Sequence, residues 1–308
     1  MKRFLDNLGF SVMLRTLDPF SLGVGGHESE IIELALTHGF EALEIDMADF
    51  ASRADHHGIV YARRLLESAQ IRVGAFCLPF DWDTEDEAFR QNLDRLNHYA
   101  ELAVQLGCTR CYGIIAPAGD KRPYHENFEL HRVRFAEICK VLAPHGVKFG
   151  VGFRASGELR KSQAFLFIHD FDALALLVKM VDAPNLGFVV DPWNWELAGI
   201  SIKELQGLHA EKIVNVQLAD MPSPRPEREE ITEQMRLLPG SGGIDLVAYL
   251  RTLREMAYDG PVSLAPHRKA LPVVRRETLV RQSAEAFQRI WREAGLEWRA
   301  PIVPSLTR

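Results

Sequence analysis

The chain has 308 residues, of which 47% are hydrophobic and 25% are charged, a composition typical of globular proteins. Its formal net charge of -6 provides no basic field for a polyanionic backbone, so we expect no nucleic-acid partner. No apolar run approaches the roughly 20 residues of a membrane span, and the first residues lack the apolar centre of a secretory signal. We therefore expect no membrane partner and a cytoplasmic location.

Four cysteines are too few for a disulfide framework in a chain of this length. Cys108 and Cys111 have the spacing of a metal-binding pair, but no second pair of Cys or His residues completes a zinc site. They fall where a predicted helix passes into a predicted strand. We therefore expect both to pack in the core.

Apolar segments typical of strands alternate with amphipathic segments along the whole chain. The predicted strands are residues 9–14, 41–46, 72–78, 110–116, 148–153, 186–191, 213–220 and 261–267. Helical spacing of apolar residues is clearest at 171–181 and 246–256. Gly39, Gly107 and Gly146 stand just before strands, where a left-handed residue commonly ends the preceding helix.

Eight such units with no internal linker predict an α/β fold, a closed parallel (β/α)8 barrel over residues 1–295, followed by a tail at 296–308. A doubly wound open sheet is the alternative, but it would normally carry a glycine-rich first turn, which this sequence lacks. In barrels of this kind the reacting groups lie at the carboxyl ends of the strands. The polar residues at those places are Arg15, Glu44, Asp46, Cys77, Tyr112, Arg154, Asp191, Asn194, Asn215, Gln217, Asp220 and His267.

Three segments carry a family resemblance. Residues 235–266, MRLLPGSGGIDLVAYLRTLREMAYDGPVSLAP, resemble the Arg-x-Leu-Pro-Gly, Gly-x-Ile-Asp and Gly-Tyr-Asp-Gly-Pro-Val run of the xylose isomerase-like barrels, the sugar phosphate isomerase/epimerase superfamily. DPWNWELAG (191–199) and VQLADMP (216–222) are similar to that family's Asp-x-Trp-His-Trp and His-x-x-Asp-x-Pro segments. The resemblance is specific for strands five to eight and rests on pattern alone in the first half.

The resemblance implies one divalent cation (Mn, Mg, Co or Zn) at the barrel mouth, held by a Glu on strand five, an Asp on six, a His or Gln on seven and a Glu on eight. Such an ion stabilises the enediolate that forms when a carbon next to a carbonyl loses its proton, and in epimerases the two glutamates also carry that proton. The matching positions here are Gly152, Asp191, Gln217 and Ala265. One carboxylate and one neutral amide are a poor cage for a hard dication. We expect no tightly bound metal, and at most a weak divalent ion on Asp191 and Gln217.

Each candidate residue has a structural alternative. His267, two residues past Ala265, is a predicted general base, and its alternative role is that of a loop histidine bonded to a neighbouring carbonyl. Glu44 is a second predicted catalytic residue, and its alternative role is a salt bridge across the barrel floor. Asp191 could instead accept backbone N–H bonds in the turn at Pro192 or pair with an arginine. The predicted substrate-binding residues are Arg154, Trp193, Asn194, Trp195, Gln217 and Arg236. The tryptophans could instead pack at the barrel top. Gln217 could be a polar residue buried inside the barrel, and Arg236 could form a salt bridge within its loop.

Two functional hypotheses follow. The first is an enzyme of the isomerase/epimerase type with an altered site, which binds a small sugar, keto-sugar or polyol and transfers a proton next to a carbonyl. The second is a non-catalytic sugar-binding barrel or partner subunit of an active paralogue. A homo-oligomer is compatible with both. A DNA repair endonuclease on the same barrel would need a trinuclear cluster of His and Glu ligands and a basic surface, and this chain is acidic.

Overall fold

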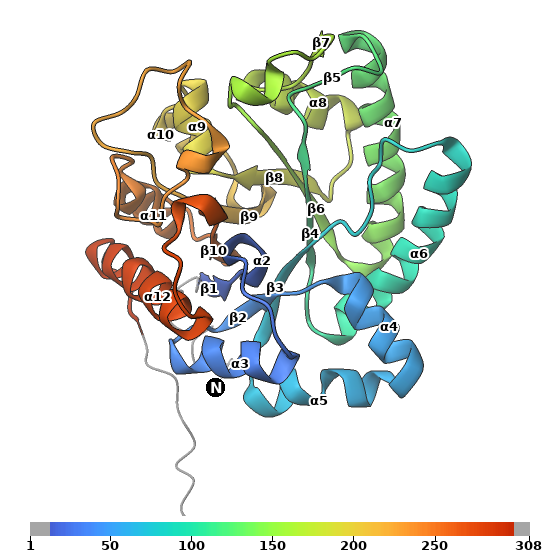
Figure 1. The fold of residues 1–308 in the computed structure, drawn as a ribbon. Helices are drawn as coiled ribbons and strands as arrows, with labels where there is room; N and C mark the ends of the chain where they lie inside the picture. The colour runs from blue at the N-terminus through green and yellow to red at the C-terminus, as the bar shows by residue number, and fades with distance from the viewer. Residues whose placement is uncertain (1–12, 299–308) are drawn as a thin grey trace, which may run out of the picture.

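A computed structural model of the chain describes residues 13–298. Eight parallel strands close into a barrel in the order β1-β10-β9-β8-β6-β4-β3-β2 (Figure 1). The strands are β1 (Leu14–Leu17), β2 (Ala42–Glu44), β3 (Arg72–Cys77), β4 (Arg110–Ile115), β6 (Lys148–Phe153), β8 (Leu186–Val190), β9 (Ile213–Leu218) and β10 (Pro261–Leu264). The predicted (β/α)8 barrel is confirmed.

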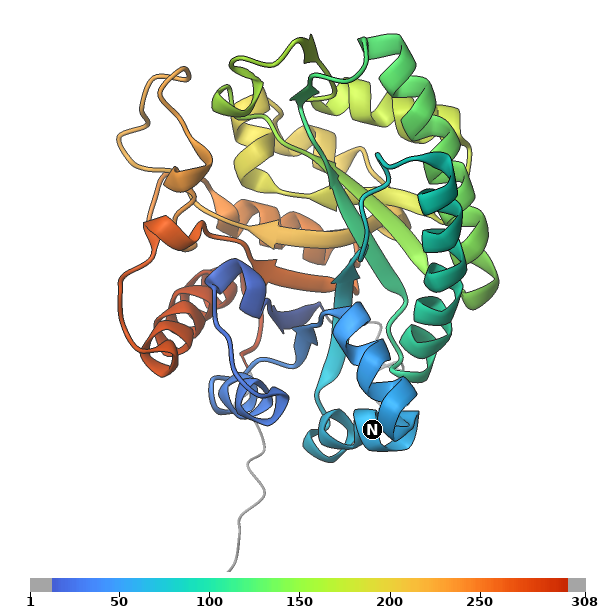
Figure 2. The same cartoon turned by 45° about the vertical axis from the view of Figure 1, so that its right-hand side comes forward.

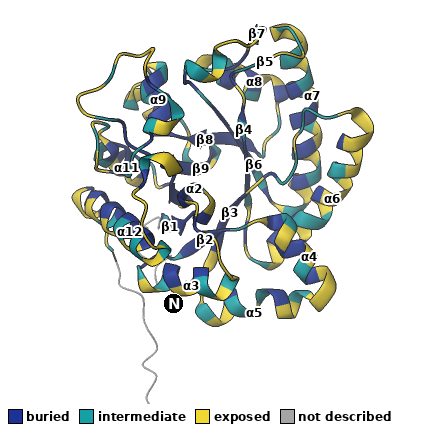
Figure 3. Ribbon diagram, in the orientation of Figure 1, coloured by how far each residue is buried: buried dark blue, intermediate teal, exposed yellow. Residues whose placement is uncertain are grey.

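Helices surround the barrel, and their inner faces are buried while their outer faces are exposed (Figures 2 and 3). The helices are α2 (Pro19–Leu22), α3 (Glu28–Thr37), α4 (Met47–His57), α5 (Ile59–Ala69), α6 (Asp86–Gln105), α7 (Tyr124–Leu142), α8 (Phe171–Val181), α9 (Pro192–Ala198), α10 (Ile202–Gln206), α11 (Leu246–Glu255) and α12 (Arg276–Glu293). Single 3-10 turns occur at η2 (Ala143–His145), η3 (Glu158–Arg160), η4 (Ala210–Lys212), η5 (Glu233–Met235) and η6 (Arg268–Ala270). The strands β5 (Ala118–Gly119) and β7 (Phe165–Leu166) form a separate antiparallel pair.

The predicted helix at 171–181 coincides with α8, and the predicted helix at 246–256 ends one residue late relative to α11. Gly39, Gly107 and Gly146 all have positive φ, as a left-handed helix end requires. The first strand was predicted too early, at 9–14. It runs from Leu14 to Leu17, and residues 1–12 lie outside the described residues.

Cys108 and Cys111 are fully buried free thiols, which confirms the expectation of core packing. The start of the predicted tail also packs on the barrel. The Trp298 ring lies edge-on to Phe40 and Phe287, and the Arg15 guanidinium lies 4.8 Å from its centroid. The rest of the tail, residues 299–308, is outside the part of the chain that the structure describes.

Candidate functional site

A cavity of about 420 Å³ lies at the carboxyl ends of the strands, where the barrel fold predicts the site. This volume suits a monosaccharide-sized ligand. The polar groups that line it come from loops and strand ends around the barrel: Asp18, Ser21, Glu44, Asp46, Cys77, Tyr112, Arg154, Gln217, Glu233, Arg236 and His267.

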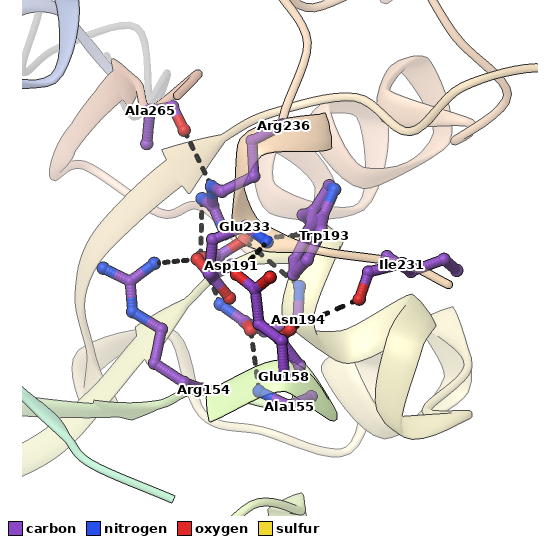
Figure 4. Close-up of polar contacts among 11 residues, drawn as sticks. Arg154, Ala155, Glu158, Asp191, Trp193, Asn194, Ile231, Glu233, Arg236 and Ala265 are labelled. Atoms are coloured by element: carbon purple, nitrogen blue, oxygen red, sulfur yellow. Dashed lines mark hydrogen bonds and ion pairs between the residues drawn. The ribbon is translucent and has the colours of Figure 1, made fainter. Parts of the chain in front are cut away.

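Asp191, which follows β8, is fully occupied by hydrogen bonds within the protein. It is the N-cap of α9, where Oδ1 accepts from the backbone N–H groups of Trp193 at 3.1 Å and Asn194 at 3.4 Å. Its Oδ2 accepts from Asn194 Nδ2 at 2.7 Å and from Arg236 Nη2 at 2.8 Å (Figure 4). The carboxylate is therefore a helix cap and one half of a buried ion pair.

Arg236 is the cation that pairs with Asp191. Besides that ion pair, its Nε donates to the Ala265 carbonyl at 2.9 Å, and its guanidinium lies 5.0 Å from the Trp193 ring centroid. The side chain is 3% exposed, and its Nη1 has no hydrogen-bond partner among residues 13–298. Two of its three nitrogens are therefore bonded to Asp191 and Ala265, and the third is buried without a partner among these residues.

The loop after β9 holds Arg236 in position. Leu237 and Asp220 form an antiparallel bridge through two backbone hydrogen bonds of 2.9 and 3.0 Å. The Asp220 carboxylate then accepts from the backbone N–H groups of Gly242 and Ile244. Any Cβ at Gly242 would come within 1.9 Å of a backbone oxygen, so the close approach requires glycine there. These contacts explain why the segment is built around glycines and Asp220.

The residues present do not fit the divalent ion that the family resemblance implies. A Cβ added at Gly152 would lie 2.8 Å from Ile114 Cδ1 and 3.1 Å from Val189 Cβ, so these apolar side chains fill the space of the expected glutamate. Ala265 offers only its carbonyl, which already accepts from Arg236. Among the described residues, no group of three or more His, Cys, Asp or Glu side chains could hold a metal ion.

Glu44 ends β2 and is 3% exposed. Its Oε2 accepts from the Tyr112 hydroxyl at 2.7 Å, and Asn215 Nδ2 lies 3.4 Å from its Oε1. Burial, together with the negative charge of Asp18, raises the pKa of Glu44 to about 8. The alternative of a salt bridge across the barrel floor is wrong, because the neighbours of Glu44 are a phenol and an amide.

His267 lies beside the cavity with one ring nitrogen already used. The backbone N–H of Lys269 donates to His267 Nδ1 at 3.1 Å, so the neutral ring carries its proton on Nε2. The His267 backbone N–H also donates to the Arg236 carbonyl at 2.8 Å. In this arrangement neutral His267 presents a hydrogen-bond donor, which differs from the predicted role of general base.

Three predicted substrate-binding residues lie beneath the cavity surface and do not line it. Trp193, Asn194 and Trp195 are each at most 1% exposed. Trp193 supports Arg236, Asn194 links Asp191 to the Ala155 backbone N–H at 2.9 Å, and the Trp195 ring lies 5.1 Å from Phe171. Their contacts match packing at the barrel top, because α9 turns all three side chains into the protein.

Of the other predicted residues, Gln217 and Arg154 line the cavity. The Gln217 side chain on β9 makes no hydrogen bond with another described residue and is 7% exposed. Arg154, after β6, is paired with Glu233 Oε2 at 2.6 Å. Gln217 is thus available to a ligand, whereas Arg154 is already neutralised.

Sequence reasoning missed Asp18 and Glu233. Asp18 caps α2, with its Oδ1 accepting from the Phe20 and Ser21 N–H groups. The sequence pattern predicts that the first strand ends at residue 14, whereas β1 ends at Leu17, directly before Asp18. Asp18 was therefore not among the residues predicted at strand ends. The Asp-Pro pair before α2 is the signal that could have found it. Glu233 lies far from any strand end, and no sequence signal marks it.

Comparisons with known proteins agree with the barrel fold. Residues 32–290 match the family described as xylose isomerase-like TIM barrel. An inosose isomerase of Bacillus licheniformis is 22% identical over 82% of this chain and 89% of its own length. A 3-dehydroshikimate dehydratase of Pseudomonas aeruginosa is 34% identical over 79% of this chain, which covers 37% of that protein.

Solved structures share the fold. A xylose isomerase domain protein from Alicyclobacillus acidocaldarius superposes with a TM-score of 0.83 at 24% identity, over 92% of this chain and all of that one. The IolI protein with a bound zinc atom superposes with a TM-score of 0.72 at 18% identity, over 92% and 98%. None of the described helices is long and apolar enough to cross a membrane. The chain belongs to the xylose isomerase-like TIM barrel family.

Proposed function

We propose that this barrel binds a small sugar, keto-sugar or polyol in the mouth cavity and transfers a proton next to the ligand's carbonyl without a divalent metal. The carrying observation is the buried Arg236–Asp191 ion pair, in which a guanidinium neutralises the one remaining carboxylate of the family's metal position. Its relatives include an inosose isomerase and a 3-dehydroshikimate dehydratase. The compounds in both of these names are ketones that carry hydroxyl groups.

In this proposal, different parts of the cavity wall bind the ligand's oxygens and transfer the proton. The Gln217 amide and His267 Nε2 offer donors for ligand oxygens near β9 and β10, and the charged Arg236 lies in the same wall. Hydrogen-bond donors and a fixed positive charge near a carbonyl oxygen stabilise the negative charge that develops there when the adjacent carbon loses its proton. Glu44 ends β2 in another part of the wall, where its carboxyl group can exchange a proton with the ligand.

Deuterium exchange tests this proposal without knowledge of the final product. The purified protein is incubated in D2O with EDTA and, separately, an inosose, D-fructose, D-tagatose and 3-dehydroshikimate. We expect at least one compound to lose the proton signal of the carbon next to its carbonyl, and Glu44→Gln to abolish this loss. Exchange that appears only after a divalent ion is added would overturn the metal-free proposal.

A second candidate is a non-catalytic sugar-binding barrel. The observation in its favour is the apolar filling around Gly152, which removes a position that in the family carries both a ligand and a proton-transfer group. Calorimetry with the same compounds separates the two candidates. Binding with no exchange supports the non-catalytic barrel, whereas neither binding nor exchange contradicts both.

A further inference from the structure

Two buried carboxyl groups lie side by side at one wall of the cavity. In the β1–β2 pair, Leu17 is level with Leu43, so Asp18 and Glu44 occupy the next level of the same two adjacent strands. Both residues are 3% exposed, and both line the cavity. They are the only such pair of neighbouring acids that we find among the buried residues of the described cavity wall.

The two groups have different partners. The Asp18 carboxylate accepts from two backbone N–H groups and from the Ser21 hydroxyl, and these donors stabilise its charge. No backbone N–H of the described residues donates to Glu44, and its partners are the side chains of Tyr112 at 2.7 Å, Asn215 at 3.4 Å and Ser263. Because two adjacent buried carboxyls do not both ionise readily, the proton belongs on Glu44.

Among the described residues, no cation compensates the charge of Glu44 at close range. The titratable groups that face it are Asp18 after β1, Cys77 on β3 and Tyr112 on β4, with the neutral Asn215 on β9 and Ser263 on β10. The cations of the cavity, Arg154 and Arg236, are engaged by Glu233 and Asp191. Burial also raises the pKa values of Asp18 and Cys77.

An independent feature points to a ligand beside these acids. Gln217 is 7% exposed, lines the same cavity, and its side-chain amide makes no hydrogen bond with another residue of the described part of the chain. A largely buried amide without a partner costs free energy unless something binds it. The cavity therefore offers a ligand an unpaired amide on one wall and a carboxyl pair on another.

We infer that Asp18 and Glu44 act as one acid–base pair, in which Glu44 carries a proton at neutral pH and gives it to the ligand while Asp18 carries the charge. This inference rests on the proposed function. Glu44 donates its proton to the carbonyl oxygen, and Asp18 accepts the proton from the adjacent carbon. The electrons of the broken C–H bond form the C=C bond of the enol, and reversal at either carbon restores both carboxyl groups.

The titration of Glu44 in the ligand-free protein tests the pair directly. Carbon-13 NMR of the labelled side-chain carboxyl groups is recorded from pH 4 to pH 10, and the signal that vanishes in Glu44→Gln is assigned to Glu44. We expect a midpoint of about 8. A wild-type midpoint in the ordinary glutamate range, near 4 to 5, would overturn the inference whatever the variants do.

Asp18→Asn tests the coupling, because asparagine retains the helix cap and removes the charge. We expect it to lower the Glu44 midpoint by about one pH unit or more. Asp46→Asn is the matched control, since Asp46 also caps a helix and lines the cavity but is exposed. An unmoved midpoint in Asp18→Asn, or an equal shift in both variants, would contradict the pair.

The exchange assay then separates this inference from the proposed function. With a compound that exchanges in the wild type, Glu44→Gln and Asp18→Asn should each lose exchange while the compound still binds. Retained exchange in either variant overturns the acid–base roles. If no compound exchanges in the wild type but the midpoint of about 8 falls in Asp18→Asn, the proposed function fails and the shared proton stands.

Discussion

Asp191 and Arg236 form a buried ion pair at the position where the family resemblance implies a bound cation. In the family pattern the Asp on strand six is a metal ligand, whereas here it accepts four hydrogen bonds from the protein, one of them from Arg236. The guanidinium is permanently charged and planar, so it can neutralise the carboxylate through Nη2 while Nε binds the Ala265 carbonyl. Both side chains are less than a tenth exposed, which places the pair in a medium of low polarity.

Removal of one partner should therefore be costly. Arg236→Met leaves the Asp191 carboxylate buried without its cation, and we expect a loss of about 3 to 5 kcal/mol in the free energy of unfolding, measured with urea. Asp191→Asn combined with Arg236→Met removes both charges and keeps an amide oxygen at the helix cap. We expect the double variant to be more stable than Arg236→Met alone, and a cost equal to the sum of the single variants would contradict a coupled pair.

At the scale of the elements, β6 determines whether the mouth can hold a metal. Gly152 faces Ile114 of β4 and Val189 of β8, and the three positions pack too closely for another side chain. This apolar layer replaces the glutamate that the family resemblance implies at the end of strand five. A glutamate cannot be restored there without moving the neighbouring strands' side chains.

Gly152→Ala should show this crowding. Because its added methyl would lie 2.8 Å from Ile114 Cδ1, we expect a loss of about 1 to 3 kcal/mol in the free energy of unfolding. Gly25→Ala is the control, since no atom lies within 4 Å of a Cβ at Gly25. Equal stability of Gly152→Ala and the control in urea unfolding would mean that the space beside Gly152 is open and would contradict this crowding.

The elements themselves follow from sequence pattern because each strand is buried on both faces and each long helix has one apolar face. The ends of strands follow less directly from sequence pattern. The apolar residues at 9–14 predict a first strand that ends four residues before Asp18, so the prediction does not place Asp18 in the candidate site. The strands β5 and β7 have two residues each, and so short a strand shows no periodicity in the sequence from which it could be predicted.

For the whole molecule, the sequence identified the family, which the comparisons show, but it did not identify the side chains that occupy the mouth. Trp193 and Trp195 belong to a motif that suggested ligand contact, and only the direction of α9 shows that they face inward. Arg236 is 18 residues past the end of β9, so its contact with Asp191 depends on how the loop folds back. Such long-range contacts are not encoded in local spacing.

The central claim is that the barrel mouth is built around a guanidinium and holds no divalent ion. Elemental analysis of untagged protein, purified without chelator and dialysed, tests it most directly. We predict manganese, cobalt, zinc and magnesium far below one ion per chain, with no change in Asp191→Ala. One tightly held ion per chain that is lost in Asp191→Ala would contradict the account.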